Sequence, residues 1–163
     1  MSKTTLRANA RTMSKIQPVD VAAKDLITDL SFLPDRYAMH IVGACLEPEV
    51  RDGSIMMFDR TEPYRVGDLV VLFRRPEALA EGVHQVIVKR LIMAPPSWVS
   101  FPWRDHPQSD VIALVGLEML IPRRRFAMRC ADLLGIHKCL SAAPEGSTMA
   151  TIELADATKE ATR

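Results

Sequence analysis

Three short segments stand in a fixed order along the chain: Gly43-Ala-Cys-Leu-Glu-Pro48, Arg51-Asp-Gly53 and Val86-Ile-Val-Lys-Arg-Leu91. The first holds a cysteine, Cys45, in a segment bounded by glycine and proline, which both favour turns. The third is an apolar run that carries a lysine, Lys89. On a strand, Lys89 shares a face with Ile87 and Leu91, so we expect its amine to lie against an apolar layer.

These motifs resemble the active-site frame of the LexA/signal-peptidase superfamily of serine-lysine proteases, and within it the S24, LexA/UmuD-like family. That frame reads Gly-x-Ser-Met-x-Pro, then Asp-Gly, then a strand with Val-Lys-Arg. The resemblance covers about residues 36–125 and implies a mainly β domain. The expected form is a LexA-like antiparallel sheet or distorted barrel of the β-ribbon type, with short flanking helices.

The resemblance also implies roles for individual residues. Cys45 occupies the nucleophile's position, Lys89 the position of the general base, and the backbone amides of Ala44 and Cys45 the oxyanion site. Four further positions match the structural part of the motif: Gly43, Pro48, Asp52 and Gly53. An enzyme of this type needs neither a metal ion nor an organic cofactor.

The chain departs from the family pattern at three positions: Cys45 replaces serine, Leu46 replaces the usual methionine, and Ser54 stands where an acidic residue often follows Asp-Gly. The first of these bears directly on hydrolysis. A thiol, with a typical pKa of about 8.5, is more acidic than a serine hydroxyl, so proton transfer to a neutral lysine is easier. A thiolate and an ammonium can also settle into a stable ion pair, and sulfur is larger than oxygen. Two alternatives therefore stay open: a peptidase that cleaves itself or a partner, and a pseudoenzyme that binds without cutting.

The customary self-cleavage dipeptide is missing. Proteins that resemble LexA or UmuD cut themselves at Ala-Gly or Cys-Gly upstream of the nucleophile. No glycine precedes Gly43, and Val42 stands before that one. Other small-residue sites, at Ala8, Ala10 or Ala22-Ala23, are compatible with cleavage but are not supported by any pattern.

Composition sets the class of protein. The chain has 163 residues, 48% hydrophobic and 25% charged, with a net charge of +1, which suits one globular domain with short extensions. Three cysteines do not form a disulfide framework. No run reaches the roughly 18 apolar residues of a membrane helix. We expect a cytoplasmic protein without membrane contact.

The chain divides into five parts by composition and periodicity: a disordered basic arm (1–17), a short amphipathic helix or linker (18–33), the peptidase-type domain (34–126), a C-terminal helix (127–140) and a flexible tail (141–163). Within the peptidase-type domain, strands are predicted at Tyr37–Val42, Ser54–Asp59, Asp68–Arg74, Gln85–Ile92, Trp98–Phe101 and Val111–Ile121.

Two other groups of residues could in principle form a binding site. A run of arginines is a candidate nucleic-acid or partner patch, or else a solvated helix face: Arg123, Arg124, Arg125 and Arg129. Cys130, His137 and Cys139 are close in sequence, but their spacing matches no standard zinc site. We predict no metal there.

The resemblance implies partners as well. A homodimer is expected, with a repressor, a polymerase or a RecA-type filament as a protein partner, in an SOS (DNA-damage) response, phage or mobile-element setting. One expected helix before the domain is too little for a helix-turn-helix, so no DNA-binding module is predicted. Nucleic-acid binding through the arginines is left open.

Overall fold

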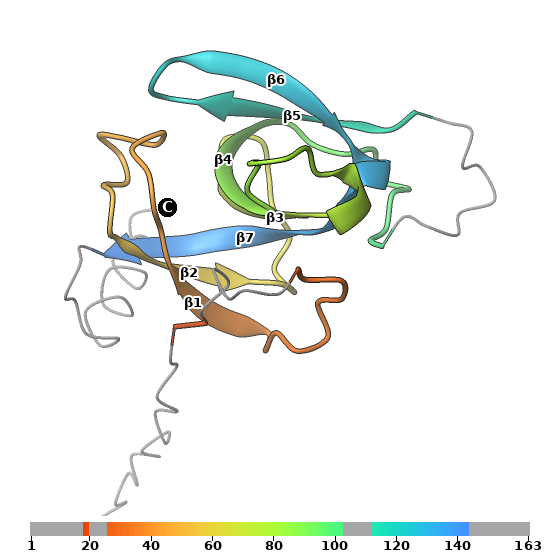
Figure 1. Ribbon diagram of the computed structural model, residues 1–163, viewed down its shortest axis with the longest axis horizontal. Helices are drawn as coiled ribbons and strands as arrows, with labels where there is room; N and C mark the ends of the chain where they lie inside the picture. Colours follow the sequence, from red (N-terminus) through yellow and green to blue (C-terminus); the bar gives the residue numbers. More distant parts are fainter. Residues whose placement is uncertain (1–17, 20–25, 103–111, 144–163) are drawn as a thin grey trace, which may run out of the picture.

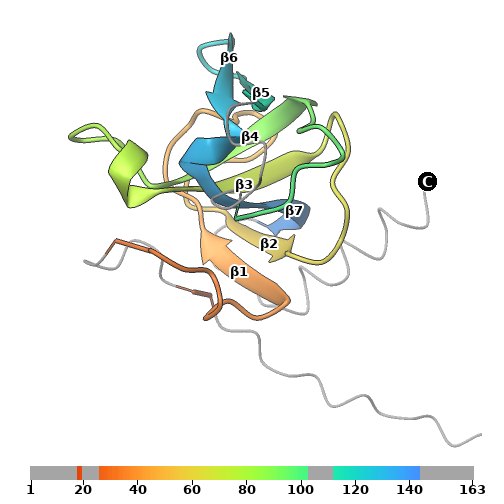
Figure 2. The same ribbon diagram turned by 90° about the vertical axis from the view of Figure 1, so that its right-hand side faces the viewer.

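The computed structural model describes residues 18–19, 26–102 and 112–143. Within them the chain forms a seven-stranded antiparallel sheet (Figures 1 and 2), which confirms the mainly β fold class. The strand order is β1-β2-β7-β3-β4-β5-β6. The strands are β1 (Arg36–His40), β2 (Ile55–Asp59), β3 (Leu69–Arg74), β4 (Val86–Met93), β5 (Leu114–Met119), β6 (Arg124–Arg129) and β7 (Leu133–Ala143), with 3-10 turns at Pro76–Ala78 and Cys130–Asp132.

The central strand β3 is buried on both of its faces. Val71 and Phe73 belong to one core cluster, which also holds Tyr37. Val70 and Leu72 point the other way, into a second cluster. A strand covered on both sides needs apolar side chains at every position, which explains the unbroken apolar run in β3.

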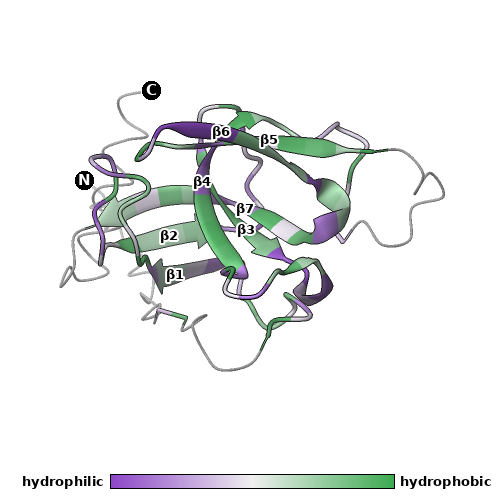
Figure 3. Ribbon diagram, turned by 45° about the horizontal axis from the view of Figure 1, so that its top comes forward, coloured by the Kyte–Doolittle hydropathy of each residue, from purple (hydrophilic) through white to green (hydrophobic). Residues whose placement is uncertain are grey.

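Strand β4 carries the bend that shapes the sheet. Its register with β5 shifts between Leu91 and Met93, and such bulges increase local bending and twist. Beyond the bend, β5 and β6 turn over β3 and β7 (Figure 1). Figure 3 shows hydrophilic colouring along much of β6, which has one strand neighbour in the described sheet. Charged residues on an edge strand discourage pairing with other chains.

The predicted C-terminal helix over residues 127–140 is wrong. Arg124–Arg129 is strand β6, a 3-10 turn follows at Cys130–Asp132, and β7 runs from Leu133 to Ala143. The first residues of the predicted tail, 141–143, are therefore strand as well. β7 lies between β2 and β3 with most of its residues buried, so its sequence lacks the alternation that marks a half-exposed strand.

The predicted helix over 18–33 is not found in the residues described there. Pro18 forms a parallel bridge with Ala38, and the Val19 N–H donates to the Ala38 carbonyl at 2.7 Å. Ile27 exchanges hydrogen bonds with the side chain of Gln85, and residues 26–29 are not helical. Tertiary contacts thus use the backbone groups that a helix would need. Residues 20–25 lie outside the described part, as do the predicted arm (1–17) and the tail after 143.

The predicted strand at Trp98–Phe101 is also wrong. This segment is a turn, in which the Val99 N–H donates to the Pro96 carbonyl at 2.9 Å. Pro95, Pro96 and Pro102 surround it, and proline has no N–H to donate to a strand ladder. No helix in the described residues has the length and apolar character that a membrane crossing requires.

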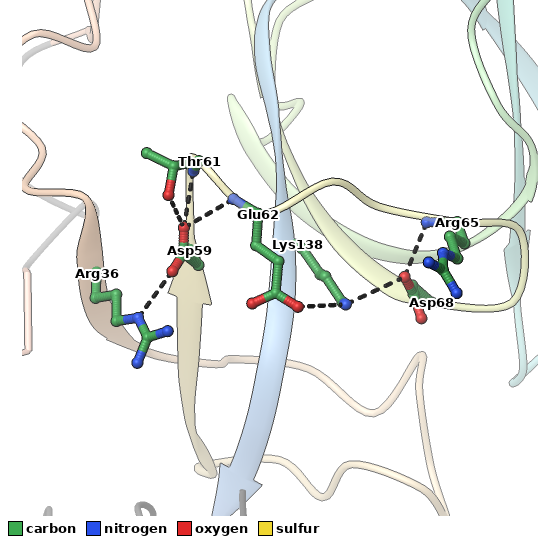
Figure 4. Close-up of polar contacts among 7 residues, drawn as sticks. All are labelled: Arg36, Asp59, Thr61, Glu62, Arg65, Asp68 and Lys138. Atoms are coloured by element: carbon green, nitrogen blue, oxygen red, sulfur yellow. Dashed lines mark hydrogen bonds and ion pairs between the residues drawn. The ribbon is translucent and has the colours of Figure 1, made fainter. Parts of the chain in front are cut away.

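A polar network fixes the connection between β2 and β3 (Figure 4). The buried carboxylate of Asp59 accepts four hydrogen bonds, from Arg36, from the Thr61 hydroxyl and amide, and from the Glu62 amide. Burial alone would raise the pKa of Asp59, but these bonds outweigh it and lower the pKa to about 2. Lys138 on β7 lies 2.8 Å from Glu62 and 3.9 Å from Asp68, so it ties this connection to the centre of the sheet.

His137 is a buried titratable group on β7. Its Nδ1 shares a 2.6 Å hydrogen bond with the Tyr37 hydroxyl, and its ring packs against Phe73. Burial, together with the nearby charge of Arg60, lowers the pKa of His137 from its ordinary 6.5 to about 4. The folded protein therefore holds this ring neutral at pH 5 to 6, where an unfolded chain protonates it.

The stability of the protein should fall as the pH is lowered from about 6.5 to about 4. Between these pH values His137 binds a proton in the unfolded state but not in the folded state. This difference lowers the free energy of unfolding by roughly 3 kcal/mol once the pH has fallen to about 4. Urea unfolding at a series of pH values measures this slope. His137→Phe should flatten it, whereas Tyr37→Phe, which leaves the histidine buried, should retain it. An equally steep slope in His137→Phe would contradict the assignment.

Candidate active site

Cys45 and Lys89 meet although they are far apart in the sequence. Cys45 lies in the loop 41–54, which joins β1 to β2, and Lys89 lies on β4. The lysine amine donates to the cysteine Sγ at 3.1 Å and to the Val88 carbonyl at 3.0 Å. The structure thus brings together the two residues that the sequence motif singled out.

The lysine is buried, as its place among apolar residues predicted. Lys89 is 8% exposed, and it pairs across the sheet with the fully buried Val70 on β3. Its strand neighbours on the same face, Ile87 and Leu91, pack in the second core cluster. A buried amine loses its hydrogen bonds to water, and the bonds to the Cys45 sulfur and the Val88 carbonyl replace them.

The loop that carries Cys45 is held at its base. The Gly43 N–H donates to Asp52 Oδ1 at 2.8 Å, and Ile41 bonds to both Gly53 and Ser54 across the loop. Gly43 has φ +107°, a conformation that side-chain-bearing residues rarely adopt. The glycine and the aspartate of the motif therefore act together to set the path of the chain just before the cysteine.

The far side of the loop is held by distant parts of the chain. The carbonyl of Cys45 accepts hydrogen bonds from the amides of Leu120 at 2.9 Å and Ile121 at 3.2 Å, in the turn that joins β5 to β6. Figure 1 shows the loop rising toward this turn. Glu49 forms an ion pair with Arg90 on β4. Sequence reasoning missed these contacts because nothing in the sequence shows that the turn faces the loop.

Buried apolar side chains pin the same loop from inside. Leu46 and Val50 are 1% and 3% exposed and belong to the first core cluster, against which Cys45 also packs. Pro48 itself is exposed. Packing and hydrogen bonds thus hold Cys45 in place, and the residue as a whole is partly exposed. Such fixation favours catalysis because the reacting group need not be ordered again.

The expected oxyanion site lies on the exposed side of this loop. Ala44 is exposed and Cys45 is half-buried. Within the described residues, neither of their amides donates a backbone hydrogen bond, whereas the Glu47 amide bonds back to the Ala44 carbonyl at 3.1 Å. Two amides free to donate beside a nucleophile are what a developing oxyanion needs.

The Cys45–Lys89 pair has the composition of a nucleophile with its base. A thiol beside a neutral amine and a thiolate beside an ammonium contain the same number of protons, so the pair can exchange a proton across the 3.1 Å contact without any other group. The thiolate form is the nucleophile. Cys130 differs from Cys45 because it is fully buried, and burial raises its pKa to about 11, whereas Cys139 is partly buried like Cys45.

The arginines of the candidate patch lie at the edge of the sheet, not on a helix, and all four are exposed. Arg123 and Arg125 both bind Glu118. The hydrogen bond from Arg125, and to a smaller extent the one from Arg123, lowers the pKa of Glu118. Binding of a nucleic acid or a partner by these arginines stays a prediction. His137 is bonded to Tyr37, and no group of metal-ligating side chains is found in the described part of the chain.

Comparisons with known proteins found no similar protein. No family model matches the chain, and neither the curated proteins nor the solved structures searched gave a match.

Replacing the lysine should not weaken the fold. Lys89→Met keeps the apolar stem and removes the buried amine, so we expect the free energy of unfolding to rise by about 1 kcal/mol, as when other buried charged groups give way to apolar ones. Urea unfolding at pH 7 measures this change. Arg90→Met, on the opposite face of β4, loses the ion pair with Glu49 and is the matched control, with no gain expected. A loss of about 2 kcal/mol in Lys89→Met would instead make the lysine a structural element.

Proposed function

We propose that this chain is an S24/LexA-like peptidase-type domain without a DNA-binding module, in which Cys45 is the nucleophile and Lys89 carries the proton. The observation that supports the proposal is the 3.1 Å contact between the sulfur of Cys45, a partly exposed residue, and the amine of a lysine that is 8% exposed. A lysine on a solvated surface at the same distance from a cysteine would not point to a catalytic role. Here the amine is buried, burial of a polar group without partners is costly, and the thiol is one of its two hydrogen-bond partners.

The positions of the groups support the following reaction. The Cys45 sulfur attacks a peptide carbonyl and forms a tetrahedral intermediate, whose oxyanion is placed to accept from the amides of Ala44 and Cys45. Lys89, holding the proton of the thiol, gives it to the departing amine, and a thioester remains. Water then attacks the thioester while Lys89 accepts its proton, and the proton returns to sulfur as the acid product leaves.

The substrate is a peptide segment of this chain or of a partner, in the regulatory setting that the family resemblance implies. Cys45 is partly exposed, and two exposed apolar side chains lie near it in the chain path: Val42 in the same loop, 88% exposed, and Ile121, 51% exposed, whose amide bonds to the Cys45 carbonyl. Exposed apolar residues beside a nucleophile favour binding of a peptide with apolar side chains.

The wild-type protein should cut a peptide bond, and loss of Cys45 should abolish the cut. Intact-mass spectrometry after incubation at about pH 7 and about pH 10, where a free lysine amine approaches neutrality, detects self-cleavage. A peptide library analysed in parallel detects cleavage in trans. Lys89→Met should slow either reaction by about a hundredfold or more, the usual contribution of a general acid-base group. Cys139→Ala, which removes a cysteine outside the loop, should leave the rate unchanged.

The Cys45→Ser variant distinguishes a peptidase from a binding module that does not cut. If the serine variant cleaves and the wild type does not, the scaffold is competent and cysteine silences it. If neither protein cuts itself or the library, and both are folded, the peptidase proposal fails and the chain is a binding module that docks without cutting.

A further inference from the structure

The contact that supports catalysis also makes the pair open to oxidation. A thiolate reacts with hydroperoxides, and susceptibility follows its thiolate character and its exposure. Cys45 is half-exposed and touches an amine, whereas Cys130 is 0% exposed. A serine at the same position would not be oxidised under these conditions. The substitution of cysteine for serine therefore gives this site a chemistry that the serine form lacks.

We infer that Lys89 resolves the oxidation of Cys45, closing a covalent S–N bond between the loop and strand β4. Sulfenic acids condense with thiols or with nitrogen nucleophiles. No second cysteine bonds to Cys45 in the described residues, whereas the lysine nitrogen lies 3.1 Å from its sulfur. The nearest partner for condensation is therefore an amine.

The steps balance with a hydroperoxide as the oxidant. The Cys45 thiolate attacks the outer oxygen of hydrogen peroxide, the O–O bond breaks, and a sulfenic acid and hydroxide form. The Lys89 ammonium gives a proton to the hydroxide, which leaves as water, so the same step frees the amine. The amine nitrogen then attacks the sulfenic sulfur, and the hydroxyl departs with an amine proton as a second water. The protein loses two hydrogens in total, and sulfur is oxidised as the peroxide is reduced.

The surroundings of the pair fit such a bond. The lysine is held toward the sulfur by its second hydrogen bond, to the Val88 carbonyl at 3.0 Å. The loop is tied to strand β4 by the Glu49–Arg90 ion pair and to the β5–β6 turn through the Cys45 carbonyl. Closure therefore requires a small movement of the flexible lysine stem and no rearrangement of the sheet.

The bond would switch the site off reversibly. It occupies the nucleophile and the proton carrier together, and it protects the sulfur from the irreversible sulfinic and sulfonic acids. A thiol reductant restores both groups, because one thiol attacks the sulfur, releases the lysine amine, and a second thiol frees the cysteine as a disulfide forms. The regulatory meaning of the bond rests on the proposed peptidase activity, whereas its formation rests on the geometry alone.

The test uses the full chain with Cys130→Ala and Cys139→Ala, so that Cys45 is the remaining thiol. The protein is treated with one equivalent of hydrogen peroxide in the presence of dimedone, a trap for sulfenic acid, and its intact mass is measured. We expect a monomer that has lost two hydrogens, with no dimedone adduct. Proteolysis should yield a peptide pair joined through Cys45 and Lys89, and dithiothreitol should restore the original mass.

Lys89→Arg in the same background is the matched control. Arginine keeps the positive charge but is a poor nucleophile, so its sulfenic acid should accumulate as the dimedone adduct. Lys89→Met, checked for folding by circular dichroism, should do the same without the charge. In the protein that retains Lys89, a dimedone adduct, a gain of oxygen, a disulfide-linked dimer or an unchanged mass would each overturn the inference.

The outcome is independent of the peptidase assay. A protein that forms the S–N bond but cuts no peptide leaves this inference standing and removes the proposed function. A protein that cuts peptides but forms no such bond does the reverse.

Discussion

The hydrogen bond between the buried Lys89 amine and the Cys45 sulfur is the contact on which the proposed chemistry of this protein depends. An amine at an 8% exposed position loses most of its water, and the 3.1 Å contact to sulfur and the bond to the Val88 carbonyl replace it. Strand β4 also carries Val88 in the first core cluster and Leu91 in the second, so apolar packing on both faces holds the strand that bears the lysine. The same packing that forms the core therefore also places the Lys89 amine next to the Cys45 sulfur.

The topology explains how such a pair is assembled from distant segments. The loop 41–54 leaves the β1–β2 end of the sheet, while β4 and the β5–β6 turn belong to the other half. The bend in β4 brings the two halves together, and the bonds from Leu120 and Ile121 to the Cys45 carbonyl fix the contact. A sulfur held from both sides can react without the ordering cost that a mobile loop would add.

The sequence predicted the parts of the fold whose pattern is local. Strands β1 to β5 and the burial of Lys89 followed from short apolar runs, and the motif pointed to Cys45 and Lys89, whereas strand β6 was not predicted. β7 was mistaken for a helix because both of its faces are buried, which removes the period-two signal. The first segment shows helical spacing, yet Ala38 and Gln85 take its backbone groups. The Leu120 and Ile121 contacts depend on how the sheet bends, which no local pattern records.

The measurement that tests the central claim most directly is the rate of alkylation of Cys45 by iodoacetamide, followed by peptide mass spectrometry across a range of pH. Wild type, Lys89→Met and Lys89→Arg are compared, with Cys139 as the internal reference. If the lysine governs the sulfur, the wild-type rate at neutral pH exceeds that of Lys89→Met severalfold, and Cys139 reacts alike in all three proteins. Superimposable Cys45 profiles in wild type and Lys89→Met would show that the contact has no chemical effect, and the account would fail.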